Sequence, residues 1–286
     1  MATSRVLFQW SALRHIRTRD SYKQRTPGKP WDYAHLNSID VDDDGHLLVS
    51  GRNTHAIYKL HRRTGRVLWT LGGKRSDFRM GRGTRFAWAH DARRQSNGEI
   101  TIFDNAAAPK VRDESRGLVL DVDERRRRVR LKRAYTHPLG LLTHILANVQ
   151  RLPDGNVFIG WGATAHFSEH ARGGRMLFDA RFADERNDTY RAYRFPWTGR
   201  PAGDPKAAAA RDGERTTVHA SWNGATEVRR WRVLAGPAPD ALAPVATAAR
   251  RDFETAVAVD TREPLVAVQA LDAAGDVLGT SPAVAP

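Results

Sequence analysis

Three histidines recur at similar places along the chain, and histidine is the side chain best suited to proton and group transfer near neutral pH. His35, His90 and His144 each lie about ten residues before a glycine that ends a short polar stretch. An imidazole can act there as a nucleophile or as a general acid and base. If the intervals reflect repeated structural units, the three side chains converge on one place, where the sequence predicts a site.

Polar and cationic residues accompany these histidines, and core packing does not explain them. A guanidinium group offers a fork of donors to sulfate or phosphate oxygens, and amides and hydroxyls add hydrogen bonds. Such a lining suits the transfer of an anionic group, although Asn53 and Asn105 also fit strand-end turns. The candidate substrate-binding residues are Asn37, Ser38, Arg52, Asn53, Asn105 and Gln150, and Arg116 joins the three histidines as a candidate catalytic residue.

Metal and thiol chemistry receive less support from the sequence. Cysteine is absent, which excludes disulfides, thiol nucleophiles, zinc ribbons and iron–sulfur clusters. The run from Asp40 to Gly45 copies the first half of a calcium loop, but Gly51 stands where the loop needs a glutamate, so a turn is favoured. His35, His90 and Asp91 lack the close spacing of a metal motif. We expect no metal and no cofactor.

The elements that would position the histidines form a repeat. Three segments share a polar turn that ends in glycine, a short apolar strand, and small or polar residues after it; their turn glycines are Gly45, Gly98 and Gly155. These intervals match the period of about 50 residues of a four-stranded propeller blade. A second hairpin follows each segment, so the sequence predicts an all-β propeller over residues 1–197 that places its ligands at the central channel.

The chain opens on the end of a blade. The segment from Ser4 to Trp10 resembles the segment from Gly65 to Trp69, which is the last strand of the first complete blade. Roughly four blades of sequence are therefore present, and a propeller needs a closed ring to bury all blade faces. We expect front blades to be missing.

A change of composition follows the propeller. Residues 198–214 are rich in Pro, Gly and Ala and predict a linker. Residues 215–286 carry short alternating strands, which predict a small β-sandwich of immunoglobulin or fibronectin type. Trp222 is expected to be a core aromatic residue of this domain.

The formal net charge of +14 raises the possibility of a polyanionic partner. The arginines are scattered, however, and the one dense run, Arg125 to Arg128, fits a solvated hairpin tip, so nucleic acid is not expected to be a partner. No apolar run approaches the roughly 20 residues of a membrane span. The first residues lack the apolar core of a signal peptide, so nothing there predicts export.

Several motifs in order resemble the arylsulfotransferase (ASST) family, in its actinobacterial branch, over roughly residues 4 to 205. The resemblance is carried by motifs at both ends and in the middle of this region. They are Asp32 to Ile39, Leu71 to Phe78, Phe86 to Ala92, Phe103 to Asn105, Ser115 to Gly117, Asn148 to Gln150, Asp154 to Asn156, Gly160 to Gly162, Ser168 to Glu169 and Tyr190 to Trp197.

The resemblance implies a six-bladed propeller enzyme that moves a sulfuryl group from a phenolic sulfate ester to another phenol through a transiently sulfated channel histidine. Its substrates would be small phenols and aryl sulfates, and relatives are commonly exported. His35, His90 and Arg116 match family motifs. His144 takes the repeat-equivalent place in the next blade as candidate nucleophile, with His137 and His166 as rivals. A chain without its front blades would lack part of the channel wall needed for this reaction.

Two other functions remain open from the sequence. The propeller and sandwich together would also suit a non-catalytic module that binds carbohydrate or protein. Arg125 to Arg128 would suit a polyanion, with steep salt dependence.

Overall fold

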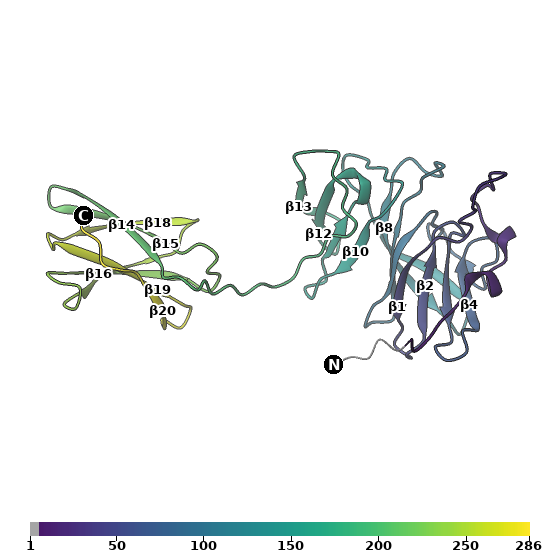
Figure 1. Cartoon of the computed structure of the whole chain (residues 1–286), viewed down its shortest axis with the longest axis horizontal. Coiled ribbons are helices and arrows are strands. Elements are labelled where there is room, and N and C mark those ends of the chain that lie inside the picture. The colour runs from purple at the N-terminus through teal and green to yellow at the C-terminus, as the bar shows by residue number, and fades with distance from the viewer. Residues whose placement is uncertain (1–5) are drawn as a thin grey trace. The chain divides into compact units, whose positions relative to one another are not determined.

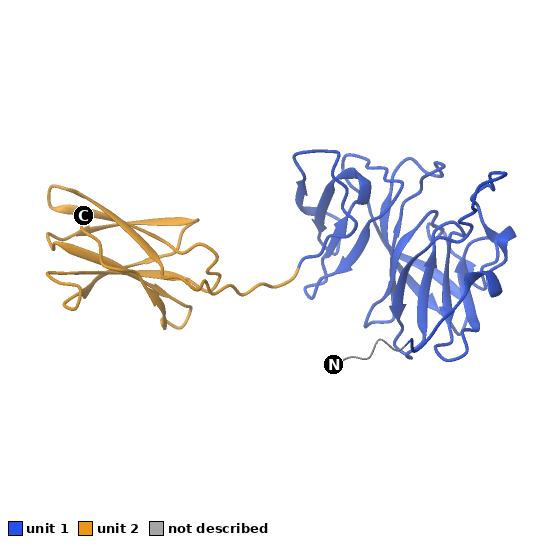
Figure 2. Ribbon diagram, viewed as in Figure 1, with its two compact units in different colours: residues 1–194 blue, residues 195–286 orange. Residues whose placement is uncertain are grey.

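The computed structural model describes residues 6–286, which form two compact units (Figure 1). The first unit spans Met1–Arg194 and the second spans Phe195–Pro286 (Figure 2). Strands make up nearly all regular structure in both. Only three short 3-10 helices occur among the described residues: η1 (Ala12–Arg14), η2 (Thr18–Asp20) and η3 (Gly162–Thr164).

The first unit contains three antiparallel sheets, each built from strands that pair in chain order. The first sheet comprises β1 (Leu36–Val41), β2 (Leu47–Gly51), β3 (Ala56–Leu60) and β4 (Val67–Gly72). The second comprises β6 (His90–Arg94), β7 (Ile100–Asp104), β8 (Arg116–Asp123) and β9 (Arg128–Tyr135), with β5 (Arg79–Met80) parallel to β9 at its edge. The third comprises β10 (Asn148–Arg151), β11 (Val157–Gly160), β12 (His166–His170) and β13 (Met176–Arg181).

The predicted repeat corresponds to the turn that joins the first two strands of each sheet. Gly45, Gly98 and Gly155 all have positive φ, at 79°, 82° and 86°, a conformation that glycine adopts without a Cβ penalty. Each donates its N–H to the carbonyl three residues earlier, at 2.7 to 2.9 Å. The prediction of repeated four-stranded units, and with it an all-β partial propeller, is confirmed. Over residues 6–286, no sheet closes on itself.

The sheets stack because each carries apolar side chains on both faces. Leu48 and Ile57 of the first sheet share a core with Ile102 and Leu118 of the second. The opposite face of the second sheet packs on the third through another core, in which Phe103 meets the Trp161 ring edge-on at 5.6 Å. Successive side chains of a strand point to opposite faces of its sheet. The apolar residues of the middle sheet therefore contribute to two cores, one on each side of it.

The outer face of the first sheet is covered by an irregular segment instead of a strand. Ile16 and Tyr33 are buried against Tyr58 of β3, and Trp10 donates its indole N–H to the Gly65 carbonyl at 2.8 Å. Residues 6–10 form no strand, and Ser4 and Arg5 lie outside the described residues. The described part of the first unit thus has three blades where the sequence suggested roughly four.

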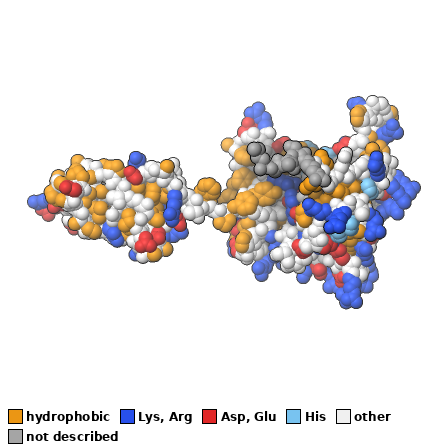
Figure 3. Space-filling model, turned by 60° about the horizontal axis from the view of Figure 1, so that its bottom comes forward, with side chains coloured by type: hydrophobic (Ala, Val, Ile, Leu, Met, Phe, Trp, Pro, Cys, Tyr) orange, Lys and Arg blue, Asp and Glu red, His pale blue; other side chains and the backbone are white. Residues whose placement is uncertain are grey.

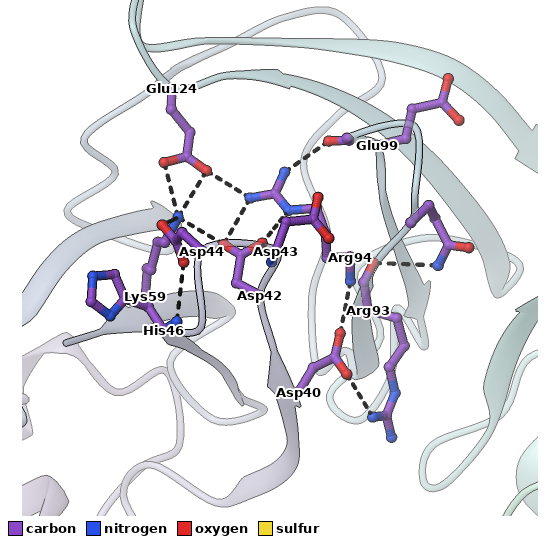
Figure 4. A network of polar contacts seen from close by, with 12 residues as sticks. Asp40, Asp42, Asp43, Asp44, His46, Lys59, Arg93, Arg94, Glu99 and Glu124 are labelled. Carbon is purple, nitrogen blue, oxygen red and sulfur yellow. Dashed lines mark hydrogen bonds and ion pairs between the residues drawn. The ribbon is translucent and has the colours of Figure 1, made fainter. Parts of the chain in front are cut away.

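A buried network of charges joins the first and second sheets (Figure 4). Arg94, at the end of β6, contacts Asp42 at 2.6 Å and Glu124 at 2.6 Å. Lys59 of β3 contacts Asp42 at 2.8 Å and Asp44 at 2.7 Å. Burial alone would raise the pKa of Asp42, but Arg94 and Lys59 outweigh it and hold the pKa at about 2. The calcium-like aspartates therefore serve as ion-pair partners around a turn.

The basic run ends a hairpin, as predicted. Strands β8 and β9 pair antiparallel, and Arg125 to Arg127 lie exposed in the turn between them. Arg126 pairs with Asp123 at 3.2 Å, and the Arg127 guanidinium lies over the Phe78 ring. Figure 3 shows Lys and Arg side chains at several separate places on one face of the first unit. This distribution gives no support to a single polyanion track.

The second unit is a sandwich of a three-stranded sheet and a four-stranded sheet. The first sheet has the order β14–β15–β18 and the second β17–β16–β19–β20. Trp231 of β16 and Val218 of β15 lie in one core shared by both sheets. Trp222 is only partly buried against that core and donates its indole N–H to the Gly203 carbonyl at 2.7 Å. The strands are β14 (Lys206–Asp212), β15 (Arg215–Ser221), β16 (Arg230–Gly236), β17 (Ala243–Ala249), β18 (Glu254–Asp260), β19 (Leu265–Leu271) and β20 (Val277–Thr280).

The sequence placed a linker over residues 198–214, and part of that expectation is wrong. Residues Lys206–Asp212 form strand β14, which pairs along its full length with β15. Alanine is a weak strand former, so composition alone pointed away from a strand here. Alternate residues of the run, Ala207 and Ala209, pack on the sandwich core. Over the described part of the chain, no helix is long and apolar enough to cross a membrane.

We expect Arg94→Met to lower the free energy of unfolding of the first unit by about 3 kcal/mol, because it leaves the buried Asp42 carboxylate with half of its cationic partners. The exposed pair of Arg126 and Asp123 is the matched control, and Arg126→Met should change stability by less than about 0.5 kcal/mol. Urea unfolding measures both, with the transition of the second unit as internal reference. Equal effects of the two substitutions would contradict the assigned role of the network.

Candidate active site

The innermost strands of the three sheets begin at the same end of the unit. His35 directly precedes β1, His90 is the first residue of β6, and His144 lies in the loop that leads into β10. Strand β1 neighbours β6, and β6 neighbours β10. The stacked blades therefore bring these three chain segments together, as their repeat positions predicted.

His35 is held by a carboxylate three residues earlier. Asp32 accepts the His35 backbone N–H at 3.0 Å and lies 2.5 Å from Nδ1 of the same residue. Since an ionised carboxylate can only accept, the proton of the neutral ring sits on Nδ1, and Nε2 of that form presents a lone pair. The His35 side chain is 46% exposed, so this lone pair is open to a substrate.

His90 has the opposite environment. It is buried, its Nδ1 lies 2.8 Å from Asn105 Oδ1, and its Nε2 accepts the Leu146 N–H at 3.3 Å. Burial, together with the nearby charges of Arg52 and His35, lowers the pKa of His90 to about 4. The hydrogen bonds thus occupy both ring nitrogens, and the lowered pKa keeps the ring neutral at pH 7.

Arg52 joins the first blade to the loop before β10. Its Nη1 donates to Asn53 Oδ1 at 2.8 Å, and its Nη2 donates to the His144 carbonyl at 2.8 Å. The guanidinium lies over the Trp88 ring, 5.0 Å from the ring centroid. Burial lowers the pKa of Arg52, opposed by the negative charge of Asp32. Two hydrogen bonds leave further N–H groups of this fork free for an anion.

Five of the residues expected from the sequence thus lie in two hydrogen-bonded groups that meet at the loop before β10. His35, Arg52 and Asn53 form one group with Asp32, which reaches the loop at His144, and His90 and Asn105 form the other, which reaches it at Leu146. His144 joins the first group through its backbone carbonyl, and its imidazole is exposed. Asn53 connects Arg52 to Asp32, because it accepts from Arg52 and its side-chain amide donates to the Asp32 carbonyl at 2.6 Å. We call these residues, with Asp32, the histidine cluster.

The other expected residues are engaged in structural contacts. Arg116 donates to Asp104 at 2.9 Å and to the Arg85 carbonyl at 2.8 Å, which fixes its guanidinium on a buried carboxylate. Asn37 and Ser38 bind Ala89 and Ala92, and so connect the first two blades.

Gln150 makes two hydrogen bonds to the backbone of Arg194, at 2.7 and 2.9 Å. These bonds, and those of Asn148 to Ala192, tie the last residues of the first unit to β10. The geometry thus assigns Gln150 a structural role.

Sequence reasoning did not single out Asp32, His55 or Trp88. Asp32 lies three residues before His35, a spacing that allows a side-chain contact within one turn. This spacing was the one feature of the sequence that could have pointed to the pair. Trp88 and His55 both have positive φ, at 56° and 51°, which no local residue pattern announced.

A cavity of about 230 Å³ lies next to the buried His55 ring, and Tyr22, Phe86 and Arg112 also line it. The ring stacks on Tyr22 at 4.0 Å and meets Trp88 edge-on at 4.4 Å. Burial, and the charges of Arg52, Arg112 and Lys74, lower the pKa of His55 to about 3. This ring stays neutral well below pH 7.

The depressed pKa values of His55 and His90 predict a loss of stability in mild acid. In the unfolded chain, histidine takes up a proton below about pH 6.5, while the folded rings stay neutral. For each of these two histidines, the free energy of unfolding therefore falls by up to about 1.4 kcal/mol for every pH unit by which the pH drops between 6.5 and the pKa of the folded ring.

His55→Phe should remove one of these two contributions. The variant gains stability relative to the natural chain as pH falls from about 6.5 to 5, while the difference between the two stays constant above pH 7. Urea unfolding across this pH range measures the effect. Parallel curves below pH 6.5 would rule out a depressed pKa at His55.

Comparisons with known proteins give a family and distant structural likenesses. A family model described as arylsulfotransferase (ASST) matches residues 1–183. No curated protein matches the chain. Among solved structures, a protein of unknown function from Bacteroides caccae is 12% identical with a TM-score of 0.35, covering 88% of this chain and 83% of its own.

Two further solved structures are similarly remote. The hydrazine synthase of Kuenenia stuttgartiensis is 14% identical with a TM-score of 0.36, covering 89% of this chain and 70% of its own. The PQQ-bound aldose sugar dehydrogenase of Streptomyces coelicolor is 13% identical with a TM-score of 0.36, covering 90% and 83%. These likenesses are too weak to carry a functional argument. The family match covers well over half of the sequence, and on that ground the chain belongs to the arylsulfotransferase family.

Proposed function

We propose that this protein transfers a sulfuryl group from a phenolic sulfate ester to a phenol, with His35 as the nucleophile. The observation that carries the proposal is the pairing of Asp32 with His35 Nδ1, which leaves the Nε2 lone pair of the neutral, half-exposed ring free. Arg52 is held next to this residue, because its backbone N–H donates to the His35 carbonyl at 2.9 Å. His90 is a poorer nucleophile because the Leu146 N–H occupies its Nε2 lone pair. The family match supports the reaction class.

The reaction follows from the chemistry of the histidine cluster. His35 Nε2 attacks the sulfur of the ester, an N–S bond forms, and the S–O bond to the phenol breaks with both electrons on the departing phenolate. The imidazole gains positive charge during the attack, and the Asp32 carboxylate stabilises that charge through Nδ1. The acceptor phenol, on losing its proton, then attacks the same sulfur and releases neutral His35.

Arg52 supplies the cation that this transfer needs. Its charge is half-buried and interacts with that of Asp32, the partner of His35, where solvent screens it less than at an open surface. The free N–H groups of its guanidinium can bind sulfuryl oxygens, while the bonds to Asn53 and the His144 carbonyl hold its position. In this proposal Arg116 is a positioning residue, since it fixes Asp104 and the chain near Arg85.

His144 carries an exposed imidazole and binds Arg52 through its carbonyl, and we assign it the proton transfers. It would protonate the departing phenolate and take the proton of the acceptor phenol. His90 is neutral, and its ring orients the Leu146 backbone and Asn105.

The main test is turnover of 4-nitrophenyl sulfate with a phenol acceptor, combined with intact-mass analysis after donor alone. The natural chain should gain the mass of one sulfuryl group and turn over, and His35→Asn should do neither. Asp32→Asn should lower turnover by about 10²-fold to 10⁴-fold, because the amide favours the wrong tautomer of His35. Asp123→Asn, at an exposed pair, is the matched control and should be active.

Two results would count against the assignment. Turnover and labelling that survive in His35→Asn would place the nucleophile elsewhere, with His137 and His166 as the next residues to replace. Absence of both turnover and label in the natural chain would favour a non-catalytic binding module.

His144→Gln separates proton transfer from nucleophilic attack. Acid assistance matters most when the leaving group is poor. We therefore expect the variant to lose about 10²-fold in rate with phenyl sulfate and much less with 4-nitrophenyl sulfate. Burst kinetics with the two donors measure the difference, and an equal loss with both would show that His144 does not protonate the leaving group.

A further inference from the structure

A second group of ligating side chains lies in the third blade and takes no part in the histidine cluster. His137 is in the loop after β9, His166 is the first residue of β12, and Asp179 belongs to β13. One ligand atom from each residue lies within 4.8 Å of the others. The His137 and His166 side chains are only 1% and 11% exposed, and Asp179 is 29% exposed.

The contacts within this group are poor hydrogen bonds. His137 Nε2 lies 3.2 Å from Asp179 Oδ1, yet this buried nitrogen has no hydrogen-bond partner among the described residues. His166 Nδ1 approaches the same oxygen at 3.3 Å. A buried polar atom left without a partner is rare in native proteins, and an unseen ion is one of the ordinary explanations.

The distances fit a bound ion. Nitrogen and oxygen ligands bind zinc at about 2.0 to 2.2 Å, so ligand atoms at tetrahedral angles are about 3.3 to 3.6 Å apart. The two approaches to Asp179 Oδ1 are close to this value. We propose that His137 Nε2, His166 Nδ1 and Asp179 Oδ1 bind a divalent first-row metal ion of the zinc type. The partly exposed Asp179 leaves a side on which water can complete the coordination.

The ring of His137 must change tautomer to bind the ion. In the metal-free geometry the Leu139 N–H donates to His137 Nδ1 at 3.2 Å, so the ring proton sits on Nε2. Binding moves that proton to Nδ1 and breaks this long hydrogen bond, and the metal bond replaces it. The ring itself stays in place, because it packs against Trp161 in a T-shaped contact with ring centroids 5.4 Å apart.

The metal would cross-link segments of the third blade. The loop after β9 belongs to the connection between the second and third blades, and β12 and β13 are the outer strands of the third. One ion would hold all three segments, and it would stabilise the folded first unit by binding it in preference to the unfolded chain. The site shares no residue with the histidine cluster, so its test is independent of sulfuryl transfer.

The experiment uses the full chain, freed of metal by a chelator and then dialysed against zinc chloride. We expect one zinc per chain by elemental analysis, and tetrahedral d–d absorption in the visible range when cobalt(II) replaces zinc. The melting temperature of the first unit should rise with zinc, while that of the second unit should not. Less than stoichiometric binding at micromolar zinc, or cobalt spectra typical of octahedral coordination by water, would overturn the proposal.

Variants locate the ion. Asp179→Asn and His166→Gln should each weaken zinc binding by about tenfold or more and remove the rise in melting temperature. His46 and His61, whose rings lie 4.7 Å apart on the first blade, provide the control for adventitious binding by a histidine pair. His61→Gln should bind zinc as the natural chain does. Loss of zinc in His61→Gln, or unchanged binding in folded Asp179→Asn, would place the ion elsewhere and overturn the assignment; metal analysis of the natural chain needs no variant to fold.

Discussion

The first unit depends on face-to-face packing of its sheets, because each sheet carries apolar side chains on two faces and cannot bury both alone. Trp161 and Phe103 meet between the second and third sheets, and Leu48 and Ile102 share the core between the first and second. This packing sets the innermost strands side by side. The ends of those strands carry His35 and His90, so the formation of the histidine cluster is a consequence of core packing.

The charged network between the first two sheets fixes the register in which they pack. Apolar cores tolerate sliding of one sheet over another, whereas Arg94 reaches Asp42, and Lys59 reaches Glu124, only in one register. That register also places Asn37 against Ala89 and Ser38 against Ala92. The polar residues that the sequence assigned to a substrate thus partly serve to align the blades, and the alignment is what positions His35 beside Arg52 on the first blade and His90 on the second.

Sequence periodicity predicted the sheets because it reflects local physics. Glycine adopts positive φ at no steric cost and is favoured in such turns, so Gly45, Gly98 and Gly155 marked three equivalent hairpins. The strand from Lys206 to Asp212 was missed because alanine carries little strand preference, and only its pairing with β15 makes it a strand. The segment around Trp10 looks like a strand in sequence, yet its described residues, 6–10, pair with no strand, and Trp10 packs on the outer face of the first sheet instead.

The site could be predicted in residue type but not in role, since role depends on partners distant in sequence. His35 and His90 look equivalent in the repeat. The structure gives His35 a carboxylate on Nδ1 and an exposed Nε2, whereas Asn105 and Leu146 occupy both nitrogens of His90. Arg116 likewise matches a cationic ligand by type, but Asp104 takes its charge. An imidazole or a guanidinium therefore becomes a catalytic candidate only where folding leaves one of its polar atoms free, and that condition selects His35, Arg52 and the exposed His144.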